Sequence, residues 1–278
     1  MTGDLHCHTR LSDGAMGLEE VIFYAKRSGL DFISITDHDT MAGVVRAGII
    51  GNRYGIRVIS GVELSCYDPK RKRKAHLLCY LPQKPDRLEG ICRKNCEARS
   101  EAGKQMTRLV ARFYPITAQL VLKYAAGSKA IFKQHIMMAL MELGYTDRIY
   151  GELYGQLFDP RDGSCFVEPE YPDIREVIDL VRLAGGKAVL AHPGTYRSEE
   201  LLDELIGQNK LDGIEVYHPR NSPPERRNLK KLAEENGLLQ TGGSDFHGFY
   251  SSTPHPLGSC MAPPETIDRL FSGMGQKA

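Results

Sequence analysis

Two histidines near the start of the chain, His6 and His8, have the type and spacing of metal ligands. They alternate with Leu5 and Cys7 in a segment that has the pattern of a β-strand. Because successive side chains of a strand point to opposite faces, both imidazoles should lie on one face, together with Asp4. Burying two such rings without a shared ligand would cost roughly 1–3 kcal/mol per unpaired group, and histidine is the commonest metal ligand. The segment therefore favours a metal site over a pair of hydrogen-bonded core histidines.

The other candidate ligands stand directly after apolar, strand-like segments. Residues 32–36 are followed by Asp37 and His38, and comparable segments precede His192 and Asp245. Imidazoles and carboxylates without cysteine suit Mn, Fe or Zn, and they suit hydrolysis of phosphate esters between two metal ions. The candidates at these strand ends are His6, His8, Asp13, Asp37, His38, Glu63, His192, Asp245 and His247.

The elements that must position these side chains alternate between strands and helices. Apolar residues recur with helical periodicity between the strand-like segments, over residues 18–28, 41–53, 174–183, 199–206 and 225–236. This alternation predicts a mostly parallel sheet, and ligands at the carboxyl ends of its strands predict the active face of an α/β barrel. The segment 76–81 brings the number of expected strands to seven. We therefore predict an α/β fold, a distorted seven-stranded (β/α) barrel.

The alternation stops between residues 83 and 169, where the sequence becomes helical. Helices are expected over residues 88–113, 118–126, 131–143 and 149–158, the second of them capped by Thr117. We predict an α-helical insertion over residues 83–169, placed between a first part of the barrel, residues 1–82, and a second part, residues 170–278.

Composition limits the possible partners. The chain has 278 residues, 41% of them hydrophobic, and a formal net charge of +1. This balance suits a folded protein with a sizeable core and argues against electrostatic binding to duplex DNA. The absence of a long apolar run argues against a membrane location, and the charged first residues argue against a signal peptide. Seven scattered cysteines fit reduced thiols. We expect a cytoplasmic protein.

A run of five cations, residues 70–74, follows the turn formers Asp68 and Pro69. We expect a hairpin tip exposed to water; the alternative is a contact with a polyanionic substrate near the mouth of the site. His76 follows this run and departs from the pattern, because it begins its strand instead of following it.

Five motifs taken together resemble the polymerase and histidinol phosphatase (PHP) superfamily, over essentially the whole chain. They are His6-Cys7-His8 with Asp13-Gly14, Thr36-Asp37-His38-Asp39, Gly61-Val62-Glu63, Ala191-His192-Pro193 and Ser244-Asp245-Phe246-His247. The chain is most similar to bacterial phosphoesterases of this superfamily that act on nucleoside 3′,5′-bisphosphates or short oligonucleotides. The resemblance implies a distorted seven-stranded barrel, in agreement with the strand count.

The resemblance also implies two or three divalent metal ions. A first position would use His6, His8, Glu63 and Asp245, a second Glu63, His76 and His192, and a third Asp13, His38 and His247. Glu63 would bridge two ions, whose shared hydroxide is the expected nucleophile. Asp13, His38 or His247 could protonate the leaving oxygen. Several relatives have histidine at the position of Asp13, and a carboxylate there favours a harder ion or weaker occupancy.

By the same resemblance the insertion supplies substrate selection. Arg99 and His135 occupy positions where relatives place cations over the barrel mouth, while Ala102 and Lys133 replace the arginines that are usual there. Lysine cannot make the bidentate contact of arginine with a phosphate. His218, at a strand end, is a further candidate for a phosphate contact, with a role in supporting a ligand as the alternative.

These observations favour a metal-dependent phosphoesterase acting on a small phosphorylated substrate of the nucleoside 3′,5′-bisphosphate type. Alternatives among enzymes are a 5′–3′ exonuclease on short oligonucleotides and a phosphatase for histidinol phosphate or for a broad range of esters. A non-catalytic accessory module would be expected to lack ligands, whereas every expected position here carries one.

Overall fold

The computed structural model describes residues 1–253 and 255–272, and its seven strands form one sheet in chain order. The strands are β1 (Gly3–Cys7), β2 (Phe32–Ile35), β3 (Arg57–Asp68), β4 (Arg73–Tyr80), β5 (Lys187–Leu190), β6 (Gly213–Tyr217) and β7 (Leu239–Gly242). Just beyond β7, Phe246 pairs with Cys7 of β1, so the two edges of the sheet meet. This nearly closed arrangement confirms the predicted distorted (β/α) barrel.

The expectation of a mostly parallel sheet is correct except at β4. Among the described strands, β1–β2–β3 and β5–β6–β7 pair in parallel, whereas β4 is antiparallel to both of its neighbours, β3 and β5. The start of β4 therefore lies at the same edge as the ends of the other strands, and His76 pairs with Ser65 near the end of β3. Reversal of one strand explains why His76 begins its strand and still reaches the candidate site.

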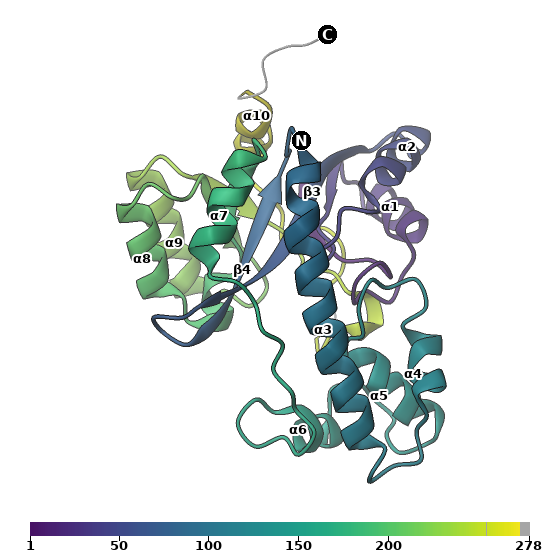
Figure 1. Cartoon of the computed structure of the whole chain (residues 1–278). Helices are drawn as coiled ribbons and strands as arrows, with labels where there is room; N and C mark the ends of the chain where they lie inside the picture. Colours follow the sequence, from purple (N-terminus) through teal and green to yellow (C-terminus); the bar gives the residue numbers. More distant parts are fainter. Residues whose placement is uncertain (254, 273–278) are drawn as a thin grey trace.

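Helices cover the outside of the barrel (Figure 1). In Figure 1, α1 (Leu18–Arg27) and α2 (Val44–Tyr54) lie on one side and α7 (Ile174–Leu183), α8 (Glu199–Gly207) and α9 (Pro223–Glu235) on the other. As the apolar periodicity predicts, α1 buries Val21, Ile22 and Ala25. Four elements have no counterpart among the predicted ones: α10 (Pro264–Ser272) and three 3₁₀ turns, η1 (Pro85–Leu88), η2 (Pro193–Tyr196) and η3 (Gly248–Tyr250). Within residues 1–253 and 255–272, no helix is long and apolar enough to cross a membrane.

The predicted helical segment forms α3 (Glu89–Val110), α4 (Ala118–Tyr124), α5 (Lys133–Glu142) and α6 (Glu152–Phe158), all between β4 and β5. Thr117 caps α4 as expected, accepting a hydrogen bond from the backbone N–H of Leu120. In Figure 1, α3 runs from the barrel to the group of α4, α5 and α6. The boundaries at residues 82/83 and 169/170 stay a prediction, and residues 254 and 273–278 of the last range lie outside the described part of the chain.

Two apolar layers hold β4 in place, and its residues alternate between them. Leu78 and Tyr80 belong to the core inside the barrel, whereas Leu77 packs outward in a core that includes residues of α7. The hydroxyl of Tyr80 donates to the carbonyl of Leu5 at 2.8 Å, which ties β4 to β1 across the interior. Since side chains alternate along a strand, His76 shares the inward face of Leu78 and Tyr80.

Candidate metal centre

His6 and His8 converge on two carboxylates from other strand ends. Nε2 of each ring lies 3.3 Å from Oε2 of Glu63, and the same nitrogens lie 3.6 and 3.3 Å from Oδ1 of Asp245. Both rings are fully buried. These four side chains are the set that the resemblance implies for the first metal position, and the structure brings them together.

The carboxylate of Glu63 faces two groups of histidines at once. Its Oε2 faces His6, His8 and also Nδ1 of His38 at 3.1 Å. Its Oε1 lies 2.8 Å from Nδ1 of His76 and 2.8 Å from Nε2 of His192. Two overlapping sets, His6–Glu63–His192 and His38–Glu63–His76, have the spacing to hold an ion. Glu63 therefore has the position of a bridging ligand.

Asp13 lies at the centre of a third group. Its Oδ1 is 3.3 Å from Nε2 of His247 and 3.7 Å from Nδ1 of His8, and its Oδ2 is 3.9 Å from Nε2 of His38. All four side chains could hold one ion. The group contains the three residues that the resemblance implies and adds His8, whose two ring nitrogens face different groups.

Three buried aspartates around the centre belong to none of these groups and serve as acceptors that hold loops. Asp37 accepts from the backbone and hydroxyl of Thr9 and from the hydroxyl of Ser12, which fixes the turn that carries Asp13. Asp39 likewise accepts from Ser65. Asp4 was expected on the face of His6 and His8, but the pairing of β1 with β2 shifts between Asp4 and Cys7. Asp4 instead accepts from Ser244 and Gly258.

The backbone is strained where ligands leave the strands. His192 has a φ of 24° and Asp245 a φ of 52°, both in the left-handed region that residues other than glycine rarely adopt. Such conformations persist only where the surrounding structure holds them, and they concentrate at functional sites. Here they turn both side chains from the ends of β5 and β7 toward Glu63 and His6.

The donor set fits divalent cations. Nε2 of His6, Nε2 of His8, Nδ1 of His38 and Oδ1 of Asp13 are buried and have no hydrogen-bond partner among the described residues. A buried polar group in this state costs about 1–3 kcal/mol unless something else binds it. Nitrogen lone pairs that converge with carboxylate oxygens are the ligands that Mn, Fe and Zn prefer. The residues therefore have the chemistry of a metal centre.

The carboxylates carry the dominant charge of this region. Burial alone would raise the pKa of Glu63, but His38 and His76 hold it well below its usual value. Burial alone would lower the pKa of His8, but Asp245 and Glu63 raise it to about 10. The same carboxylates that attract protons to the rings would attract metal cations in their place.

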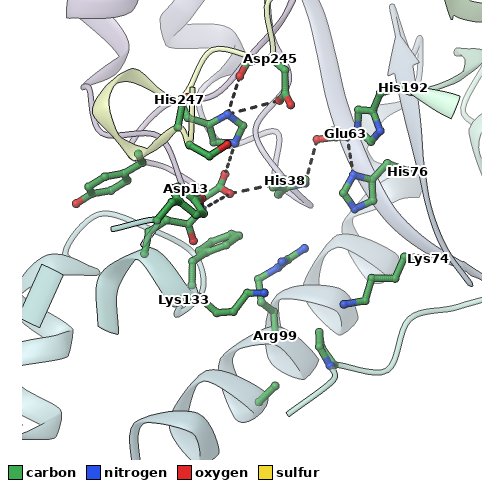
Figure 2. A pocket seen from close by; sticks show the side chains of 18 of the residues that line it. Asp13, His38, Glu63, Lys74, His76, Arg99, Lys133, His192, Asp245 and His247 are labelled. Atoms are coloured by element: carbon green, nitrogen blue, oxygen red, sulfur yellow. Dashed lines mark hydrogen bonds and ion pairs between the residues drawn. The ribbon is translucent and has the colours of Figure 1, made fainter. Parts of the chain in front are cut away.

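A pocket of about 210 Å³ opens beside the centre, and cations line its other side. In Figure 2, Lys74, Arg99 and Lys133 point into it from below the histidines and carboxylates. Arg99, on α3, lies between the rings of Phe132 and Tyr171, 4.6 and 5.2 Å from their centroids. The pocket therefore offers positive charge next to the candidate metal centre, as an anionic substrate requires.

The position of His135 does not support the substrate contact expected of it. Its side chain is buried, lies outside the residues that line the pocket, and accepts a hydrogen bond at Nδ1 from the backbone N–H of Phe132 at 3.2 Å. Burial also lowers the pKa of His135 to about 4, so the ring is neutral at physiological pH. Its side chain caps α5, and the nearby cation Lys133 lines the pocket.

His218 also lies outside the residues that line the pocket, behind Asp245. Its Nδ1 accepts from the backbone N–H of Arg220, so the neutral ring carries its proton on Nε2, 3.3 Å from Oδ2 of Asp245. The phosphate contact expected of His218 is therefore not supported, whereas the alternative of supporting a ligand fits. Glu215, on β6, is a second buried supporting residue, with Oε1 2.8 Å from Nδ1 of His6. Its place near a strand end, like that of Glu63, was the available sequence signal.

The run of cations at residues 70–74 is not a hairpin tip wholly exposed to water. Arg71 contacts Asp68 at 3.0 Å and Glu204 at 3.0 Å, and Lys70 contacts Glu204 at 2.8 Å. Lys74 lines the pocket instead. The expectation holds for Lys70, Lys72 and Arg73, which are exposed, but not for Arg71 and Lys74. No local pattern relates the run to Glu204, which lies far along the chain.

The relatives of nearly full length that comparison with known proteins finds include the following three. A phosphoribosyl 1,2-cyclic phosphate 1,2-diphosphodiesterase of Eggerthella lenta is 36% identical over 92% of this chain and 97% of its own. The 5′–3′ exoribonuclease Rnm of Escherichia coli is 30% identical over 88% of this chain and 84% of its own. A 3′,5′-nucleoside bisphosphate phosphatase of Chromobacterium violaceum is 28% identical over 88% of this chain and 86% of its own.

Solved structures agree. A crystal structure from Bifidobacterium adolescentis, described as a candidate metal-dependent phosphoesterase, is 30% identical with a TM-score of 0.89 and covers 97% of this chain and 95% of its own. A Chromobacterium violaceum amidohydrolase with bound sulfate and no metal is 26% identical with a TM-score of 0.82, over 98% and 96% of the two chains. The PHP domain model matches residues 4–181, a range that holds six of the nine residues that the resemblance assigns to the three metal positions, namely His6, His8, Asp13, His38, Glu63 and His76. With this match, the relatives and the geometry of the centre, the chain belongs to the PHP domain family and is a metal-dependent phosphoesterase.

Proposed function

We propose that this enzyme hydrolyses one phosphate ester of a small ribose derivative that carries two phosphate groups, with a nucleoside 3′,5′-bisphosphate as the first candidate. The observation that carries the proposal is the position of Arg99 and Lys133 in the same pocket as Asp13 and Glu63. One phosphate would bind at the metal centre, and the other would meet the cations.

The metal positions of this proposal are those of the sequence analysis, with His8 contributing to two of them. They are His6, His8, Glu63 and Asp245; Glu63, His76 and His192; and Asp13, His38 and His247 with His8. Divalent ions supply an acidified water as nucleophile and positive charge for the phosphoryl oxygens. The chain itself holds the ligands in place through buried carboxylates and strained strand ends.

His247 is the proposed proton donor to the leaving oxygen when it is not a ligand. Its Nδ1 lies 2.7 Å from the backbone carbonyl of Asp245, which can only accept, so Nδ1 carries a proton. Nε2 faces Asp13 and the pocket. In the neutral ring this nitrogen offers a lone pair to a metal, and in the cationic ring it offers a proton, with Asp13 orienting the ring in both states.

Arg99 is the proposed grip on the second phosphate. Its Nη2 is 2.6 Å from the hydroxyl of Ser65 and 3.4 Å from Oδ2 of Asp39. The flanking rings of Phe132 and Tyr171 restrict the guanidinium further. Because the guanidinium has five N–H donors and these contacts use one nitrogen, donors remain for a phosphate in the pocket.

A second candidate substrate is a phosphoribosyl 1,2-cyclic phosphate. The relative from Eggerthella lenta, with 36% identity over nearly the whole of both chains, carries this substrate in its name. By that name the compound also has two phosphate groups on one ribose. Both candidates use the metal centre and the cations, whereas histidinol phosphate has one phosphate and would leave Arg99 and Lys133 without a partner.

The test compares substrates and the Arg99→Ala variant, both in Mn-loaded protein. Phosphorus NMR follows an adenosine 3′,5′-bisphosphate, a phosphoribosyl 1,2-cyclic phosphate, a short oligoribonucleotide and an aryl phosphate. We expect a doubly phosphorylated compound to be preferred over the aryl phosphate. A charged hydrogen bond contributes about 1.5–3 kcal/mol, so Arg99→Ala should lower its kcat/KM by about 10- to 150-fold, with a smaller loss on the aryl phosphate. Preference for the oligoribonucleotide, or equal losses on both esters, would contradict the proposal.

A further inference from the structure

We propose that Lys74 is a specificity-determining residue that binds the second phosphate of the substrate, and that the carboxylate of Glu168 competes with that phosphate for it. The inference rests on the proposed function, which places a second phosphate among the cations of the pocket. It adds a cation from the barrel itself to the two that the insertion supplies, and it adds an internal competitor.

Lys74 reaches the pocket because of its place on β4. It precedes His76 by two residues, so both side chains lie on the inward face of the strand. Two residues of a strand span about 7 Å, which sets Lys74 roughly that far along the strand from a proposed metal ligand. The spacing leaves room for a small sugar between a phosphate at the metal centre and one at Lys74.

Three cations from three elements converge on this place. Lys74 comes from β4, Arg99 from α3 and Lys133 from α5, and Figure 2 shows all three pointing into one part of the pocket. The ammonium groups of Lys74 and Lys133 each lie 5.3 Å from the centroid of the Phe166 ring. Burial lowers the pKa of Lys133, and the charge of Arg99 lowers it further. Mutual repulsion of this kind is relieved when an anion binds between the cations.

The described residues do not neutralise this cluster. Lys133 has no carboxylate within ion-pair distance in the described part of the chain, and Arg99 is held by Ser65 and by a single 3.4 Å contact with Asp39. Lys74 has one ion pair, with Oε1 of Glu168 at 3.2 Å. The cluster therefore retains positive charge for a substrate.

The position of Glu168 would allow a phosphate to displace it from Lys74. It lies in the segment between α6 and α7, next to Val167 and Pro169, which line the pocket, and its side chain is 53% exposed. Ion pairs with a partner this exposed contribute little, because water and salt screen them. A phosphate dianion has more charge and more acceptor oxygens than the carboxylate, so it should displace Glu168 from Lys74 and release it into water.

The other cations of the same run do not share this role. Lys70 and Arg71 are engaged with Glu204, and Arg73 donates to the backbone carbonyl of Arg197 at 2.7 Å. None of them lines the pocket. Lys72 has no hydrogen bond or ion pair among the described residues and lies in the turn of the hairpin, which makes it a matched control.

The experiment measures KM and kcat of Mn-loaded wild type, Lys74→Gln, Glu168→Gln, the double variant and the control Lys72→Gln. The substrates are whichever doubly phosphorylated compound the wild type prefers and an aryl phosphate. We expect Lys74→Gln to raise KM for the former about 5- to 20-fold, with a smaller effect on the aryl phosphate. Glu168→Gln should lower that KM about two- to fivefold, and this gain should disappear in the double variant. Lys72→Gln should match wild type.

The outcomes separate this inference from the proposed function. If the wild type shows no preference for a doubly phosphorylated compound and Arg99→Ala shows no selective loss, the proposed function and the role of Lys74 are both overturned. If Arg99→Ala shows the selective loss but Lys74→Gln behaves as Lys72→Gln does, only the role of Lys74 is overturned. If Glu168→Gln lowers KM equally with and without Lys74, the carboxylate repels the substrate through its charge alone. The proposed competition between Glu168 and the phosphate for Lys74 is then overturned. Circular dichroism of each variant shows whether a loss reflects unfolding.

Discussion

Glu215 lies with Oε1 2.8 Å from Nδ1 of His6, and both side chains are fully buried. The contact turns Nε2 of His6 toward Glu63 and Asp245. The other oxygen of Glu215 accepts from the backbone N–H of His192 at 2.8 Å. One carboxylate that faces away from the pocket thus orients two of the proposed metal ligands.

Replacing this carboxylate should weaken metal binding. Glu215→Gln removes the charge that orients the ring of His6 and raises its basicity, and changes of this kind typically lower metal affinity 10- to 100-fold. Isothermal titration calorimetry of the metal-free protein with Mn measures the change in affinity. Glu199→Gln, at an exposed position on α8, is the control. Equal affinities for Mn in the two variants would show that Glu215 has no part in orienting His6.

Substitution of Glu63 should remove more bound metal than substitution of Asp13. Glu63→Gln removes charge from both groups of histidines that its two oxygens face, so we expect turnover to be abolished and most metal to be lost, with the fold intact. Asp13→Ala affects the third group alone and should lower activity with a smaller loss of total metal. Elemental analysis measures the bound metal of each variant, and an assay of the same preparation measures its activity. Equal metal loss would contradict the proposed division of ligands, and active protein without metal would contradict the metal centre itself.

Binding of the second phosphate should weaken at alkaline pH. Burial and the charge of Arg99 lower the pKa of Lys133 to about 8, against the opposing charges of Glu168 and Asp159. Lys133 is therefore a cation below pH 8 and becomes neutral above it, so its attraction for phosphate is present below that pH and is lost as pH rises. We expect KM of the doubly phosphorylated substrate to rise above pH 8. The Lys133→Arg variant keeps a positive charge at high pH and should remove the rise in KM. If KM still rises above pH 8 in this variant, another group is responsible for the rise.

The contacts of Asp68 should stabilise the barrel without serving the reaction. Its side chain is 2% exposed and its oxygens contact Nη1 of Arg71 at 3.0 Å and Nη1 of Arg175 at 3.1 Å. Asp68→Asn leaves two partly buried guanidinium groups with less compensation, and we expect it to lower the free energy of unfolding by about 2–3 kcal/mol. Urea denaturation measures this, with the exposed Asp86→Asn as control. An unchanged midpoint, or a loss of activity in folded protein, would contradict this role.

Local pattern was sufficient to predict the seven strands and to predict that the candidate ligands which follow parallel strands lie together. A strand exposes every second residue to one face, and parallel strands end at one edge, so His6, Glu63 and Asp245 had to meet. Local pattern was not sufficient to predict that β4 is antiparallel, because the direction of a strand in a sheet depends on its neighbours. It was also not sufficient for His135 and His218, whose ring nitrogens contact groups that only the folded chain brings near.

The same limit applies to Lys74. Five cations in succession look alike in the sequence, and long-range contacts distinguish them: Glu204, 134 residues from Lys70, takes two of the five, and the inward face of β4 takes Lys74 into the pocket. The positions of candidate ligands at strand ends are thus predictable from local spacing, whereas the positions of the proposed substrate contacts depend on distant segments.

Helix α3 belongs to two cores, with Cys92 packed in the core between the sheet and α7, and Met106 and Val110 packed among α4, α5 and α6. Arg99 lies between these ends, at the level where Asn95 donates to Asp39. Because α3 packs in both cores, a substitution that changes the packing at Val110 is expected to shift Arg99 more than the strands of the barrel that carry the candidate metal ligands. Substitutions in the distal helices can therefore alter the position of a proposed substrate contact without touching the substrate or the strands that carry the candidate metal ligands.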